Sequence, residues 1–313
     1  MSNTDVEFYD LYGRGLTVTP TLEPLSMNTE LREFTENRWQ EKNSKWKNSY
    51  CVRASELIFG DNGVKVQAGY MTYKDHLGII YASEEIKQGS FEKGTPLMGI
   101  SMYGLTADNM IPLQRRSSTV GQSSGKVMFI AGGWMSAMNI LGKERCEDLE
   151  VLKDSRLYDT NIQSQREFVE ETGLEEKDFL LVPFGTIRGG IDNGVVVSYV
   201  ANIYMDGKMV KERMEKGVHE GKDEYDKVML LPKEGLADLL RNQPRLQKEN
   251  EKTFISADPR EQILISEAIG GFVAAYRHLV SRELPKDIIE KLGEGGINFR
   301  NMPTSNLEHY FFS

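Results

Sequence analysis

Residues Arg166–Leu174 read Arg-Glu-Phe-Val-Glu-Glu-Thr-Gly-Leu, and no other stretch indicates as much about the fold and the chemistry of this chain. Residues 157–172 contain neither glycine nor proline, and Gly173 follows them as a typical helix stop. The stretch therefore predicts a helix over 157–172. Its apolar spacing predicts the side that packs against a core, formed by Tyr158, Ile162 and Val169.

Three carboxylates gather on one face of this predicted helix. Glu170 and Glu171 follow Glu167 by three and four positions, which is about one helical turn. Like charges at this spacing repel each other when they are solvated. A hard divalent cation such as Mg²⁺ prefers oxygen ligands, so the pattern favours a metal site over a plain acidic surface helix.

The composition is that of an ordinary globular protein. Of 313 residues, 39% are hydrophobic and 27% charged, which allows one large domain or two modest ones. The net charge of -9 argues against a sequence-independent nucleic-acid surface. The two cysteines, Cys51 and Cys146, lie far apart, which favours a reduced cytoplasmic setting over a disulfide framework. No apolar run reaches about 18 residues, and Met1–Thr17 lacks a signal-peptide core, so no membrane segment is expected.

The order of strand-like and helix-like segments predicts an α/β fold with a mixed sheet flanked by helices. Residues 1–94 are expected to form an N-terminal α/β extension, 95–285 the main domain and 286–313 a C-terminal tail. Within the extension, Gly60–Gly63 predicts a turn between two strands. The segment Tyr73–Gly78 is expected to be a turn-rich connection.

The stretch Arg166–Leu174 resembles the second half of the Nudix box, the signature of hydrolases that act on nucleoside diphosphates linked to another group. The resemblance implies a Nudix-type α/β/α sandwich, with the acidic helix under the catalytic cleft. The first half of the box departs from the pattern, because its earlier glutamate has no clear counterpart here. Gly133, of the pair Gly132–Gly133, stands 33 positions before Arg166 (166 minus 133), where the pattern has about 14, so roughly 19 residues are inserted.

Three further segments resemble the Nudix subfamily of UDP-glucose and UDP-galactose diphosphatases, whose box carries a similar insertion. They are Met71–Gly78, Thr106–Asn109 and Leu113–Ser117, and the matching patches extend over residues 65–280. This resemblance implies Mg²⁺-dependent cleavage of a UDP-sugar to UMP and a sugar 1-phosphate, with Mn²⁺ as an alternative ion. The implied partner is a small nucleotide-sugar, with neither nucleic acid nor membrane, and the oligomeric state stays open.

The Nudix resemblance also implies roles for the residues of the acidic helix. Glu170 and Glu171 would be the main metal ligands, and Glu167 would be a further ligand or would polarise the attacking water. Arg166 would orient a glutamate through an ion pair, and the backbone carbonyl of Gly133 would be an additional ligand.

An acidic residue from a later segment would act as base or ligand. Two candidates, Glu220 and Glu224, precede the strand-like run 227–231. Glu224 is preferred because of its distance from that strand.

Substrate contacts are expected from two places outside the helix. Side chains alternate along the predicted strand 110–116, so either Arg115 or Arg116 faces the cleft and binds the diphosphate. Tyr73 and Lys74 would contact the uridine or the sugar, since an aromatic ring can stack on a base.

Two other functions stay open. The same chemistry could serve ADP-ribose, a dinucleotide or coenzyme A, because base recognition lies outside the box. The interrupted box would also fit a catalytically silent Nudix module that binds a nucleotide or a protein. The acidic cluster argues against this catalytically silent module, since a protein without catalysis has no need to hold repelling carboxylates together.

Overall fold

The chain folds as a mixed α/β structure, which confirms the predicted fold class. The computed structural model describes residues 4–11, 14–42, 48–87, 97–117, 127–138, 147–189, 194–216, 223–242, 247–249, 253–255, 266–281, 283–294, 297–301 and 308–311. Within these ranges no helix is long and apolar enough to cross a membrane.

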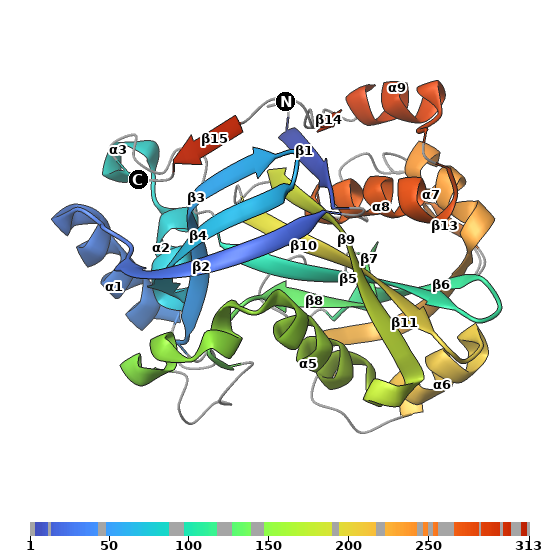
Figure 1. The fold of residues 1–313 in the computed structure, drawn as a ribbon, viewed down its shortest axis with the longest axis horizontal. Coiled ribbons are helices and arrows are strands. Elements are labelled where there is room, and N and C mark those ends of the chain that lie inside the picture. The colour runs from blue at the N-terminus through green and yellow to red at the C-terminus, as the bar shows by residue number, and fades with distance from the viewer. Residues whose placement is uncertain are drawn as a thin grey trace.

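The main sheet has six strands in the order β14-β1-β9-β10-β5-β8 (Figure 1). Strand β10 runs parallel to β5 and antiparallel to β9, and β1 runs parallel to β14, so the sheet is mixed as predicted. One strand each from segments 1–94 and 286–313 therefore lies in this sheet. In the order of the sheet, the strands are β14 (Ile297–Asn301), β1 (Thr4–Asp10), β9 (Phe179–Gly189), β10 (Gly194–Ile203), β5 (Met98–Thr106) and β8 (Ala131–Trp134).

Smaller sheets complete the strand inventory of the described residues. A four-stranded sheet consists of β15 (Glu308–Phe311), β3 (Tyr50–Gly60), β4 (Gly63–Thr72) and β2 (Gly15–Pro24). Strands β3 and β4 form a hairpin at Gly60–Gly63, which confirms the predicted turn. A three-stranded sheet consists of β11 (Tyr225–Pro232), β6 (Met110–Arg116) and β7 (Val127–Met128), and β12 (Gln247–Glu249) pairs with β13 (Thr253–Ile255).

The helices cover both faces of the main sheet. Along β10, Val195 and Val197 belong to the core that holds Phe168 of α5 (Thr160–Thr172), whereas Val196 belongs to the core that holds Phe272 of α8 (Ser266–Leu279). Helices α5 and α8 therefore pack on opposite faces of one sheet. The other α-helices among the described residues are α1 (Thr29–Lys42), α2 (Tyr73–Tyr81), α3 (Glu84–Lys87), α6 (Gly207–Lys216), α7 (Leu236–Asn242) and α9 (Lys286–Glu294).

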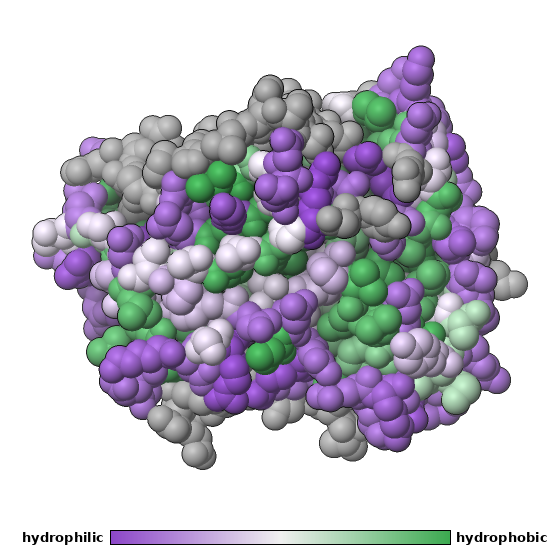
Figure 2. Space-filling view, in the orientation of Figure 1, coloured by the Kyte–Doolittle hydropathy of each residue, from purple (hydrophilic) through white to green (hydrophobic). Residues whose placement is uncertain are grey.

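Helix α5 lies at the lower centre of the molecule in Figure 1, where Figure 2 shows hydrophilic side chains with a hydrophobic one among them. Its buried residues are Thr160, Gln163, Ser164, Phe168, Glu171 and Thr172, so its inward side is mostly polar. Phe168 is the large apolar side chain of that side.

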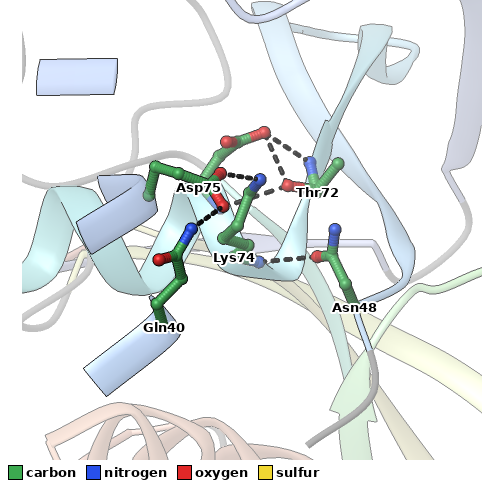
Figure 3. Close-up of polar contacts among 6 residues, drawn as sticks. Gln40, Asn48, Thr72, Lys74 and Asp75 are labelled. Carbon is green, nitrogen blue, oxygen red and sulfur yellow. Dashed lines mark hydrogen bonds and ion pairs between the residues drawn. The ribbon is translucent and has the colours of Figure 1, made fainter. Parts of the chain in front are cut away.

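The segment Tyr73–Gly78 is helical, so the prediction of a turn-rich connection was wrong. It forms most of α2, and Figure 3 shows the contacts that start this helix. The Thr72 hydroxyl accepts a hydrogen bond from the Asp75 N–H (3.2 Å) and donates one to Asp75 Oδ2 (2.6 Å). The same carboxylate accepts a bond from the Thr72 N–H at 3.1 Å. This reciprocal capping box was the overlooked signal in the sequence.

Replacing Thr72 with alanine is expected to lower the free energy of unfolding by about 1 kcal/mol, because the cap of α2 is lost. Urea unfolding of the purified variant measures this change. Ser83→Ala is the matched control, since Ser83 Oγ accepts a 3.3 Å bond from the Ile86 N–H at the start of the much shorter α3. Its effect is expected to be smaller, and equal losses in the two variants would contradict the importance of the capping box.

Candidate functional site

Caps at both ends fix the position of α5. Asp159 Oδ1 accepts hydrogen bonds from the N–H groups of Asn161 (2.9 Å) and Ile162 (3.1 Å). The helix therefore begins at Thr160, three residues later than predicted. Gly173 ends it with a left-handed φ of 67°, as predicted.

Phe168 determines which side of α5 faces inward. Its ring is fully buried, 4.5 Å from the ring of Phe179. The predicted packing side of the helix was wrong, because Ile162 and Val169 are only partly buried and the side around Phe168 faces the core instead. Val169 packs at the edge of this core, and Tyr158 precedes the helix in a 3-10 turn (Ser155–Tyr158). Glu171 lies near Phe168 around the helix and is buried with it, with 3% of its surface exposed.

Glu171 is held by two donors from different strands. The Gly132 N–H on β8 donates to Oε1 at 3.3 Å, and Gln114 Nε2 on β6 donates to Oε2 at 3.1 Å. Both oxygen atoms are therefore oriented by elements distant in sequence from α5.

Glu167 lies against the glycine pair of β8. Its Oε1 is only 2.5 Å from the position that a Cβ atom on Gly133 would occupy, so a larger residue there would push the Glu167 carboxylate away. The carboxyl groups of Glu167 and Glu171 also share a hydrogen bond. The structure thus brings Gly132–Gly133 and the acidic helix together, although about 33 positions separate them in sequence.

The carboxyl groups of this cluster ionise with difficulty. Burial, and then the charges of Glu224 and Glu170, raise the pKa of Glu167 to about 8. Burial, and then the charges of Glu167 and Glu224, raise the pKa of Glu171 well above its ordinary value. The site therefore favours positive partners, either protons or a cation.

The charge of Glu224 raises the pKa of both Glu167 and Glu171, so Glu224 acts on them electrostatically. It directly precedes β11, and its carbonyl accepts a 2.8 Å hydrogen bond from the Ser117 N–H. Its carboxylate lies 3.8 Å from Arg116 Nη2. The alternative residue Glu220 lies outside the described residues.

The alternation of side chains along β6 separates the two arginines. Gln114 and Arg116 are two positions apart and both reach the acidic cluster, at Glu171 and Glu224. Arg115 points to the opposite face, and its backbone pairs with Lys227 and Val127. Gln114 was not among the predicted site residues. Its position two residues before Arg116 on a strand could have placed it on the same face as that arginine.

Arg166 and Glu170 form an ion pair on the more exposed part of α5. Arg166 Nη2 lies 3.2 Å from Glu170 Oε1, and 40% and 30% of the two side chains are exposed. Glu170 still contributes charge to Glu167, so it lies at the rim of the cluster.

Tyr73 and Lys74 are the first two residues of α2, and Figure 3 shows the polar contacts of Lys74. Lys74 Nζ donates to Glu36 Oε2 of α1 at 2.6 Å, and its N–H donates to Asn48 Oδ1 at 2.9 Å. Tyr73 packs against the apolar cluster that contains Leu31 of α1. These contacts join α1 to α2, and substrate binding by either residue stays a prediction.

The cluster offers the oxygen ligands that a hard cation prefers. The raised pKa values of buried Glu171 and partly buried Glu167 fit this chemistry, since a cation would relieve their repulsion. Among the described residues, no three His, Cys, Asp or Glu side chains already stand in a metal-binding arrangement. A bound cation would therefore have to draw the carboxylate oxygens closer together.

Several solved structures are similar to this chain in part. A MutT/Nudix family protein from Listeria innocua is 17% identical over 60% of this chain and 97% of that chain, with a TM-score of 0.33. The MutT protein from Methanosarcina mazei Go1 is 16% identical over 48% and 85%, with a TM-score of 0.29. A Nudix hydrolase from M. smegmatis is 13% identical over 62% and 88%, with a TM-score of 0.27.

A scan against models of protein families and a search of curated proteins gave no match. The structural similarities, with TM-scores below 0.5, do not assign the chain to a family.

Proposed function

We propose that this protein is a Mg²⁺-dependent hydrolase of the Nudix type that cleaves the diphosphate of a nucleotide-sugar, with Mn²⁺ as an alternative ion. One observation carries the proposal: Glu167 and Glu171 of α5 lie against the Gly132–Gly133 turn, where burial, their mutual repulsion and the charge of Glu224 raise their pKa values. Carboxylates that serve only solubility lie in solvent, so this arrangement favours a metal site.

The residues of the cluster would have different roles in the proposed reaction. Bound Mg²⁺ would neutralise the diphosphate and make its phosphorus easier for water to attack. Glu171, oriented by Gln114 and Gly132, and Glu170, oriented by Arg166, would be the main ligands.

Glu167 would be a further ligand or would polarise the attacking water, and the carbonyl of Gly133 stays a proposed ligand. Glu224, with 47% of its side chain exposed, would accept the proton of that water. Arg116 lies 3.8 Å from Glu224 and is the proposed diphosphate-binding arginine, whereas Arg115 faces away.

A UDP-sugar is the proposed substrate, on the strength of the resemblance over residues 65–280. The proposed location is the cytoplasm. Lys74 could contact uridine or sugar only after its 2.6 Å ion pair with Glu36 opens, and Tyr73 would contribute by stacking. ADP-ribose, a dinucleotide or coenzyme A would suit the same metal chemistry.

Hydrolysis of UDP-glucose and UDP-galactose is expected in the presence of Mg²⁺ and is expected to cease when a chelator is added, because the proposed ligands alone cannot neutralise the diphosphate. Phosphate-coupled assays of these sugars, together with ADP-ribose, NADH and coenzyme A, measure this. Turnover confined to the last three would keep the metal site and discard the uridine assignment. Absence of hydrolysis for every substrate of the panel would refute the proposed hydrolase activity and favour a binding module.

A further inference from the structure

Gln114 contacts the acidic cluster through a completely buried amide. Its Nε2 donates to Glu171 Oε2 at 3.1 Å, while the Gly132 N–H donates to the other oxygen, Oε1, at 3.3 Å. Donors from β6 and β8 therefore hold the Glu171 carboxylate from both sides. A hydrogen bond to an ionised acceptor is stronger and more directional than one between neutral groups.

Stability alone does not explain a glutamine at this position. Its carbonyl oxygen Oε1 is buried and accepts no hydrogen bond from the described residues. An unsatisfied buried carbonyl costs free energy, and a methionine of similar length would avoid that cost. The benefit that offsets it is the amide N–H aimed at Glu171.

The neutrality of this donor suits a cation site. On the same face of β6, Arg116 already contributes a positive charge, and it lies near the more exposed Glu224. A second cationic side chain beside Glu171 would neutralise the carboxylate and compete with a metal ion. An amide orients the carboxylate and leaves its negative charge available.

We propose that Gln114 is a positioning residue that holds Glu171 in the orientation needed to bind a divalent cation. This inference rests on the proposed function and adds to it a residue that carries no charge and binds neither the metal nor the substrate. Loss of a group that orients a metal ligand typically weakens metal binding roughly ten- to a hundredfold.

The test is the Mg²⁺ dissociation constant of chelator-stripped Gln114→Met, measured by calorimetry with Mg²⁺ alone. Gln163→Met is the matched control. Gln163 is also fully buried, its Oε1 also accepts no bond from the described residues, and its Nε2 donates to the carbonyls of Ser136 (3.4 Å) and Leu157 (3.1 Å) instead of a carboxylate. Kinetics over a range of Mg²⁺ concentrations provide a second readout.

The dissociation constant is expected to rise roughly ten- to a hundredfold in Gln114→Met and to stay unchanged in Gln163→Met. At saturating Mg²⁺, kcat of Gln114→Met is expected to approach that of the wild type, which a general loss of structure would not allow. If Gln114→Met does not fold, Gln114→Asn withdraws the amide by one methylene and is expected to weaken binding in the same direction.

Wild-type affinity in a folded Gln114 variant would overturn the positioning role and leave the proposed hydrolase intact. Absence of Mg²⁺ binding to the wild-type protein would overturn the proposed metal site and this inference together. The two failures are thus distinguished by the wild-type titration.

Discussion

Replacing Glu171 with glutamine is expected to lower kcat by at least about a hundredfold while the protein stays folded. Glutamine has nearly the same size, so the packing beside Phe168 is retained. It carries no charge, however, and it has one accepting oxygen, so it can keep only one of the two bonds that Gly132 and Gln114 donate to the carboxylate. The expected loss comes from weaker binding and poorer orientation of the cation.

Steady-state kinetics on the substrate found in the panel, with circular dichroism as a check of folding, measure this effect. Glu176→Gln is the control, because Glu176 is an exposed glutamate just beyond the same helix. Its kcat is expected to equal that of the wild type. Full activity of Glu171→Gln with unchanged metal dependence would refute the role of Glu171 as a ligand.

The metal-free protein is expected to lose stability as the pH rises from about 5 to about 8. The pKa of Glu167 is about 8 in the folded state, above its ordinary value of 4.5. Between these two values the folded state keeps a proton that the unfolded chain has released, so stability falls with rising pH. Glu171 acts in the same direction, because its pKa is also raised by burial and by the charge of Glu167.

The expected fall in melting temperature is roughly 5 °C across this window, since stability changes by on the order of 1 kcal/mol per pH unit. Thermal unfolding with a chelator at about pH 5.5 and about pH 8 measures it. Mg²⁺ should restore most of the loss at the higher pH, because the cation replaces the proton. Glu167→Gln should flatten the dependence, and a wild-type melting temperature equal at both pH values with chelator would contradict this account.

The sequence predicted the elements whose signals are local. The end of α5 was correct because Gly173 is a residue type that a left-handed C-cap requires, and the β3–β4 turn was correct for a similar reason. Helix α2 was not predicted although its signal is also local, since the Thr72–Asp75 capping box starts it.

The candidate site could be predicted only in part. The spacing of Glu167, Glu170 and Glu171 identified the acidic face, but Gln114 lies 57 positions from Glu171 and no local pattern joins them. Alternation along β6 indicated that one of two arginines faces the cluster, without indicating which one. That choice depends on the register of β6 with β11, which only tertiary structure determines.

The pairing of β1 with β14 has a consequence for how this protein is made. Thr4 pairs with Ile297, so β1 receives this neighbour only after 293 more residues (297 minus 4) have been synthesised. Until then, a nascent chain exposes at least one backbone edge of β1, which is open to pairing with other chains. Contacts between such distant residues also slow folding, because a long loop must close before they form. Completion of the main sheet is therefore expected to be a late step, and chains that stop before residue 297 are expected to aggregate.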